Sequence, residues 1–151
     1  MAVDHVEMSP LQLVKLAYTR VHVEPFVHRD ENEQELPPAT EFSGVDIACR
    51  TGMRPLPASE NQPPEYMVEV GISLAEEQVA AHRLPYVVEV GAWGHFRLIS
   101  DMDPAKRDSL VEVNGASLVV GALRELVADL TARCPYGTMT LPTLRFVPAT
   151  E

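Results

Sequence analysis

Histidines are the residues of this sequence that best suit metal binding or acid–base chemistry near neutral pH. The chain has five, and His22 and His28 lie six residues apart, so they could share one face of an extended segment. Glu24 lies close to His22, but a zinc site needs three or four ligands in a fixed geometry, and nothing completes this set. We therefore expect ordinary surface histidines and no bound metal.

Catalytic and nucleotide-binding motifs are missing from the sequence. It has no Gly-rich phosphate loop, no nucleophile elbow and no HExxH pair. Gly91 and Gly94 flank Trp93 inside an expected strand and precede no helix, so they do not form a dinucleotide fingerprint. Glu76 and Glu77 fall in an expected turn, where solvent would surround them. The pattern favours a protein that is not an enzyme and needs no cofactor.

The charge balance restricts the class of partner. Twelve Lys and Arg residues face 22 Asp and Glu residues, which gives a formal net charge of −10. Phosphate-rich partners select basic surfaces, so we expect neither nucleic acid nor an anionic membrane as a partner. Two cysteines, Cys49 and Cys134, are too few for a disulfide scaffold, and we expect both to be small buried hydrophobes.

The sequence also predicts where in the cell the protein is found. No apolar run approaches the roughly 18 residues that a membrane span requires. The first ten residues carry acid rather than base and have no apolar centre, unlike a signal peptide. We expect a cytoplasmic protein that does not insert into membranes.

Strands account for most of the expected secondary structure. The segments 11–24, 66–74 and 86–99 are rich in β-branched and aromatic residues and predict strands, and 42–50 is a weaker candidate. In 66–74 apolar residues alternate with polar ones, which is typical of a half-buried antiparallel strand. The apolar face of 11–24 changes partway, which predicts a bulge near Thr19–Arg20.

Turns and loops are expected between these strands. The charged segment 30–35 and the loop 101–106 interrupt the apolar pattern, and 53–64 contains four prolines that indicate a linker. A polar turn with at most one helical turn is expected over 75–84.

One long amphipathic helix is expected near the end of the chain. Apolar residues recur at spacings of three and four on one face. They are Val119, Leu123, Leu126, Val127, Leu130 and Cys134. Asp108 or Asn114 could cap its start, and Pro135 with Gly137 would end it.

Several strands followed by one long helix indicate an α+β fold. We expect a single domain over residues 1–151, with an antiparallel sheet of about four strands and the C-terminal helix packed on it. The helix carries small residues away from its apolar face, at Gly121, Ala128 and Ala132 beside Glu125. They would let a second helix approach closely as an oligomer interface, or they are uncritical surface positions.

Three segments together resemble the SecB chaperone family. The run 11–24, with its Tyr18–Thr19 pair and closing Glu24, is similar to that family's first strand. The run 86–90, followed by Gly94 and Phe96, resembles a later strand of the family. Further matches lie in the long helix and in the apolar segment after it. These are Arg124, Glu125, Arg133, Tyr136, Leu141 and Phe146.

This resemblance implies a SecB-like holdase, a chaperone that captures unfolded polypeptides and keeps them soluble without nucleotide. It implies a homo-oligomer, either a dimer or a tetramer of paired dimers. The clients would be export-competent unfolded chains, or one specific client such as an antitoxin, because some SecB-like proteins serve toxin–antitoxin systems.

The resemblance also implies binding residues. Glu24, Val87 and Glu89 match positions through which export members dock on the translocase motor SecA, while Arg20 stands where the family has an acid. Apolar residues of the sheet and of the 109–120 crossover would line a client groove. They are Phe42, Val45, Trp93, Leu110, Leu118 and Met139.

A second reading belongs to another functional class. A small ligand-binding or enzyme domain could share this α+β architecture, because a fold does not determine a function. It would require a polar pocket that holds a titratable group with a strongly shifted pKa.

Overall fold

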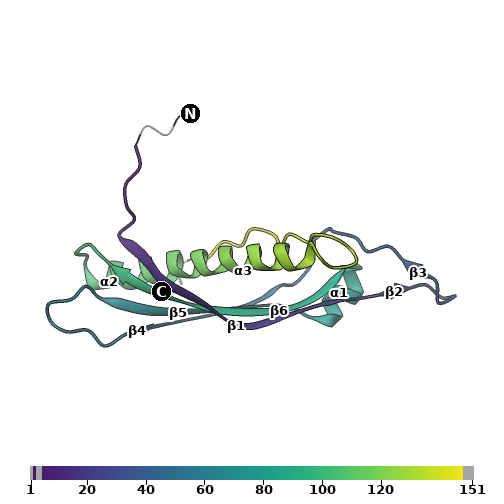
Figure 1. Ribbon diagram of the computed structural model, residues 1–151, viewed down its shortest axis with the longest axis horizontal. Helices are drawn as coiled ribbons and strands as arrows, with labels where there is room; N and C mark the ends of the chain where they lie inside the picture. Colours follow the sequence, from purple (N-terminus) through teal and green to yellow (C-terminus); the bar gives the residue numbers. More distant parts are fainter. Residues whose placement is uncertain (1, 3–4, 148–151) are drawn as a thin grey trace.

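A twisted four-stranded antiparallel sheet with one long helix across one face forms the body of the molecule (Figure 1). The computed structural model describes residue 2 and residues 5–147. The sheet order is β1-β6-β5-β4, so β1 (Leu11–Pro25) and β4 (Ala48–Pro55) are its edges. The central strands are β6 (Tyr86–Leu98) and β5 (Glu65–Leu74). The expected α+β fold with about four strands is confirmed.

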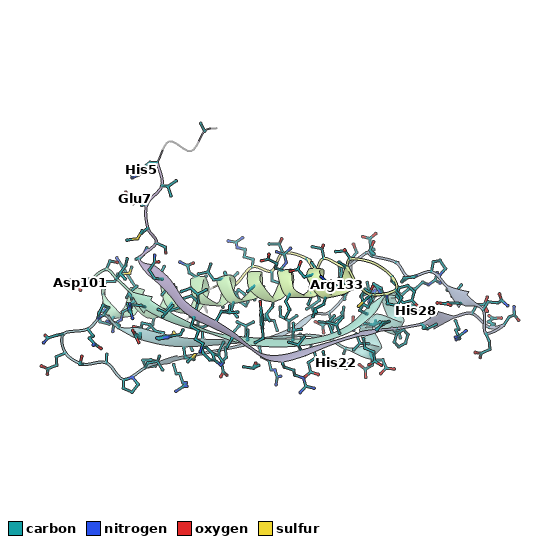
Figure 2. The ribbon with its side chains drawn as sticks, viewed as in Figure 1. His5, Glu7, His22, His28, Asp101 and Arg133 are labelled. Carbon is teal, nitrogen blue, oxygen red and sulfur yellow. The ribbon has the colours of Figure 1, made fainter. Side chains whose placement is uncertain are left out.

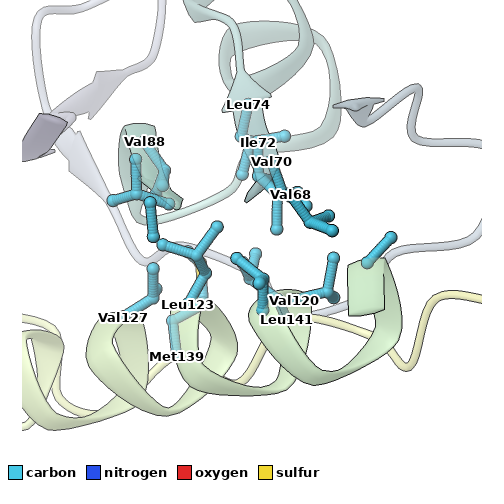
Figure 3. Packing of buried hydrophobic residues seen from close by; sticks show 14 of the residues in the cluster. Val68, Val70, Ile72, Leu74, Val88, Val120, Leu123, Val127, Met139 and Leu141 are labelled. Atoms are coloured by element: carbon cyan, nitrogen blue, oxygen red, sulfur yellow. The ribbon is translucent and has the colours of Figure 1, made fainter. Parts of the chain in front are cut away.

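The core lies between this sheet and the helical run. Alternate residues of β5 and β6 are buried because they point toward α3 (Ala116–Thr131). Figure 3 shows residues of this core meeting across the interface between sheet and helix. They include Val68, Val70, Ile72, Leu74 and Val88 from the sheet, Val120, Leu123 and Val127 from α3, and Met139 and Leu141 from the tail.

β1 keeps its apolar residues on the helix side through a bulge. Its register with β6 shifts between Tyr18 and Arg20, which confirms the bulge expected near Thr19–Arg20. The extra residue restores the alternation, so Val21 pairs with Val90 on the same face on which Tyr18 pairs with Ala92. A further shift lies at Leu13–Lys15. Both bulges lie in β1, opposite the part of β6 on either side of Trp93.

Two segments near β4 were predicted wrongly. The strand expected over 42–50 begins only at Ala48, because Gly44 takes a positive φ of 76° and a turn joins Val45 N–H to the Phe42 carbonyl. The linker expected over 53–64 begins later, because β4 extends to Pro55. Proline is compatible with this position because β4 is an edge strand.

Short elements fill the connections. β2 (His28–Arg29) and β3 (Glu35–Leu36) form a small hairpin around the charged turn expected at 30–35. The helix α1 (Glu76–His82) occupies most of the expected polar turn, and it ends at Arg83 with φ 55°. This helix is longer than the single turn expected there.

The helical run starts earlier than the sequence indicated. α2 (Pro104–Leu110) occupies part of the loop expected over 101–106, and the Asp103 side chain caps it by accepting a hydrogen bond from the Ala105 N–H. Neither Asp108 nor Asn114 caps the run. Proline at the first helical position needs no N–H partner, which explains the early start. A π-helical turn, η1 (Val111–Gly115), joins α2 to α3.

No helix among the described residues is long and apolar enough to cross a membrane.

Candidate binding surfaces

The histidines singled out by spacing do not meet. His22 lies in β1 on the side of the sheet away from α3, with its Nε2 atom 3.4 Å from Glu24 (Figure 2). His28 is buried beside Phe26, and its Nε2–H donates to the Leu84 carbonyl at 2.6 Å. Within residues 5–147 no group of three His, Cys, Asp or Glu side chains is placed to hold a metal ion.

One compact group of titratable side chains lies on the sheet. Glu65 accepts hydrogen bonds from His95 at 2.9 Å and from Arg97 at 3.0 Å. The bonds from His95 and then Arg97 lower the pKa of the Glu65 carboxyl below its usual value. A carboxylate kept charged and tied to a neighbouring strand fits a cross-strand ion pair rather than a general acid.

The face of the sheet that α3 does not cover is the first candidate surface. We call it the open face. It brings the three predicted motor-docking residues together, because Glu24 pairs directly with Val87 and Glu89 lies two residues along β6. Arg20 forms an ion pair with Glu89 at 2.9 Å on this same face.

A shallow hollow of about 440 Å³ lies in the middle of the open face. Gly71 and Gly91 pair across β5 and β6 at its floor, so no side chain fills this part of the sheet. Charged side chains surround the glycines, among them Arg20, Arg50 and Glu69. The hollow is open and polar, unlike the enclosed apolar pockets that usually hold small ligands.

A second cavity, of about 340 Å³, lies where the 60–64 loop meets the segment after β6. Arg107 lines it, and its buried Nε atom has no hydrogen-bond partner within the part of the chain that the structure describes. Glu60 and Asp101 also line the cavity, so its charge is mixed.

The outer face of α3 is the second candidate surface. Gly121, Glu125, Ala128 and Ala132 form one stripe along the helix, opposite its buried residues. A Cβ atom added to Gly121 would meet no other atom within 4 Å. Leu118 is 49% exposed and lies one turn before Gly121 on this face. We call these five residues the α3 stripe.

The free edge of β1 is the third candidate surface. Four of its apolar side chains are between 44% and 51% exposed, namely Leu13, Val14, Tyr18 and Val21. Large exposed apolar side chains gathered on one edge strand indicate a contact surface. Sequence reasoning placed these residues in a strand, but it did not identify the strand as an edge.

The six residues expected to line a client groove do not lie together. Trp93 is on the open face, where Lys15 Nζ lies 5.7 Å from its ring, whereas Met139 is in the core on the opposite side of the sheet. Met139 is 1% exposed, so its assignment to a groove is corrected to the core. Phe42, Val45 and Leu110 are half-buried against that core, and Leu118 belongs to the α3 stripe.

The tail is anchored by hydrogen bonds that sequence reasoning did not find. The buried Thr131 hydroxyl donates to the Val127 carbonyl at 2.7 Å and accepts from the Met139 N–H at 2.8 Å. Arg124 donates two hydrogen bonds to the Leu141 carbonyl. These bonds hold the tail against α3, where Met139 and Leu141 complete the core rather than form a free surface.

Neither cysteine is placed as a reactive thiol. Cys49 is half-buried in β4, and burial raises its pKa. Cys134 donates from its sulfur to the Leu130 carbonyl. A raised pKa makes the Cys49 thiol a poor nucleophile at neutral pH.

No protein-family model matches the chain. No curated protein matches it in sequence. Solved structures do resemble it. One is a SecB-like chaperone of Mycobacterium tuberculosis in complex with a ChAD peptide from the HigA1 antitoxin, with a TM-score of 0.50 and 17% identity over 91% of this chain and 93% of that one. Another is a Streptococcus agalactiae protein of unknown function, with a TM-score of 0.52 and 11% identity over 87% of this chain and 96% of that one. At these identities the likeness is one of fold, so the chain shares the fold of a SecB-like chaperone.

Proposed function

We propose that this protein is a chaperone subunit that holds unfolded polypeptide and acts by binding rather than by chemistry. The fold that it shares with a SecB-like chaperone over 91% of its length is the observation that carries the proposal. Because that structural neighbour is a chaperone and not an enzyme, we favour binding over catalysis.

The surfaces of the chain suit such a task. An unfolded client presents apolar side chains together with unpaired backbone N–H and C=O groups. A sheet edge pairs with the backbone, and exposed apolar side chains cover the apolar groups. The described part of the chain offers both, at the edges β1 and β4 and at the apolar side chains along β1.

The proposal includes assembly of two or four copies. The α3 stripe has room for a second helix because Gly121 has open space beside it. β1, which contacts α3, carries apolar side chains about half exposed, which a second copy would cover. The stripe thus keeps its expected role as an oligomer interface in this proposal.

A dedicated client, such as an antitoxin, is the partner that we favour over the translocase motor. The structural neighbour holds an antitoxin peptide. On the open face, Arg20 pairs with Glu89 and so occupies one of the carboxylates of the expected docking site. The proposed site of action is the cytoplasm, where newly made chains are still unfolded.

The test is suppression of aggregation. A chemically unfolded test protein is diluted into buffer with and without this protein at equal subunit concentrations, and light scattering is followed. We expect scattering to fall in proportion to the chaperone added, and size-exclusion light scattering to give a dimer or tetramer. A monomeric protein that leaves the aggregation unchanged would contradict the proposal and favour a ligand-binding domain.

Motor docking is tested separately by affinity measurement with purified SecA. We expect weak binding to the natural chain and tighter binding to Arg20→Asp, because the reversal frees Glu89 and restores an acidic surface. Tight binding to the unchanged chain would make the motor the favoured partner.

A further inference from the structure

The outer edge of β4 is free over the whole strand. β4 pairs with β5 on one side, and no other backbone hydrogen bond among the described residues reaches residues 48–55. In an antiparallel strand every second residue directs its N–H and C=O away from its partner. This edge therefore offers a ready row of donors and acceptors to one more strand.

The two sides of β4 differ in chemistry. Arg50, Gly52 and Arg54 alternate on the open face and are all exposed. Cys49 and Met53 lie on the other side, half-buried against the core, with the exposed Thr51 between them. A strand laid along this edge would place its own alternate residues beside a basic row and an apolar row.

In the described part of the chain, Arg50 and Arg54 lack the carboxylate partners that Arg20 and Arg97 have. Arg20 pairs with Glu89, and Arg97 pairs with Glu65. Among the described residues, no carboxylate lies within ion-pair distance of either β4 arginine. Glu69 stands opposite Gly52, between the two arginines, and offsets part of their charge without pairing with either.

The open face is also nearly neutral, although the protein as a whole is acidic. It holds five of the 12 Lys and Arg residues but four of the 22 Asp and Glu residues. They are Lys15, Arg20, Arg50, Arg54 and Arg97, with Glu24, Glu65, Glu69 and Glu89. An acidic segment is therefore repelled less on this face than on the rest of the surface, and it is attracted to the two β4 arginines.

A second copy of the chain fits this edge poorly. Two β4 strands paired antiparallel about Gly52 would place Arg50 of one copy opposite Arg54 of the other. Like charges directly opposite each other destabilise a strand pair. The β1 edge, with its exposed apolar side chains, does not carry this repulsion.

We propose that the β4 edge binds an extended client segment by strand addition, and that this segment alternates acidic with apolar residues. Its acidic residues lie beside Arg50 and Arg54, and its apolar residues lie beside Cys49 and Met53. The inference rests on the proposed chaperone function and specifies which clients, or which part of a client, the protein prefers.

Three fluorescent peptides of the length of β4, eight residues, test the inference. One alternates Glu with Val, one alternates Lys with Val, and one has the Glu–Val composition with its charges grouped at one end. Fluorescence anisotropy against the full chain should show the alternating Glu–Val peptide binding at least about tenfold more tightly than the other two. Equal binding of the Glu and Lys peptides would overturn the proposal.

The site is located by charge reversal and hydrogen exchange. Arg50→Glu with Arg54→Glu should reverse the preference toward the Lys–Val peptide. Lys106→Glu with Arg133→Glu changes the net charge equally at exposed positions on the helical side and should not. If the reversal impairs folding, Arg50→Gln with Arg54→Gln should lose the preference instead.

Strand addition has a signature that loose electrostatic binding lacks. Amide exchange over residues 48–55 should slow when the Glu–Val peptide is bound, while exchange along β1 stays unchanged. Protection along β1, or none at all, would overturn the inference. The aggregation assay with the wild-type protein separates the two proposals. If the protein suppresses aggregation but the peptide does not slow amide exchange in β4, the chaperone proposal stands and only strand addition at β4 is refuted.

Discussion

Single side chains hold the tail of this protein in place. Thr131 is the clearest case, because its buried hydroxyl bridges the Val127 carbonyl and the Met139 N–H at the end of α3. Tyr86 makes a similar bridge, donating to the Gly137 carbonyl and accepting from the Tyr136 N–H. A buried polar group that loses its partner is costly, so these residues fix the position of the tail more firmly than apolar contact alone would.

Replacing Thr131 with Val should destabilise the protein by about 1–3 kcal/mol, because the side chain keeps its shape while the Met139 N–H loses its acceptor. Thr143→Val is the matched control, since Thr143 is exposed in the tail. Urea unfolding followed by circular dichroism, at one fixed protein concentration, measures both. Equal losses in the two variants would show that the hydroxyl bridge does not stabilise the tail.

Elements are brought together by glycines where the helix meets the sheet. A Cβ atom at Gly94 in β6 would lie 2.6 Å from Phe96 Cε2 and 3.0 Å from Val119 Cγ2. At Gly115, in the π-helical turn, it would lie 3.0 Å from Val68 Cγ2. The helical run can therefore lie close to β5 and β6 because glycine has no side chain at either position.

Gly94→Ala should therefore destabilise the fold by about 1–3 kcal/mol through overpacking. Gly52→Ala in β4 is the control, because an added Cβ there meets nothing within 4 Å. Thermal and urea unfolding compare the two. The double variant Gly94→Ala with Val119→Ala should lose less stability than the sum of the two single variants, because Val119→Ala removes one of the atoms that the added Cβ would crowd. Full additivity would show that the glycine is not required for this approach.

The whole molecule leaves two kinds of edge in its sheet. β1 carries exposed apolar side chains, while the arginines of β4 have no carboxylate partner among the described residues. The first suits another copy of the chain, and the second suits an acidic segment. This division would let the protein assemble through one edge and bind through the other.

Gly121→Leu should shift the oligomer toward smaller species, because a large side chain fills the space that a second helix needs. Gly121→Ala, in contrast, should stabilise the isolated fold by up to about 1 kcal/mol, since Ala favours a helix more than Gly does. Arg133→Leu is the control, as an exposed apolar addition outside the stripe. Light scattering across a concentration series reports the assembly state, and an unchanged state in Gly121→Leu would remove α3 from the interface.

The sequence by itself determined the alternation of β5, the apolar stripe of α3 and the bulge in β1, because each depends on a local period that tertiary contacts reinforce. It misplaced β4, because four prolines nearby looked like a linker and only pairing with β5 makes residues 48–55 a strand. It started the long helix too late, because Asp103 and Pro104, which cap and begin α2, were assigned to a loop.

Only the tertiary structure decided which residues share a surface. Glu24, Val87 and Glu89 meet because β1 and β6 are neighbours, whereas Trp93 and Met139 are separated because the sheet lies between them. The sheet order also made β1 and β4 the edges, which no local pattern could indicate. Strand order is set by contacts between distant segments, and the surfaces open to a partner follow from that order.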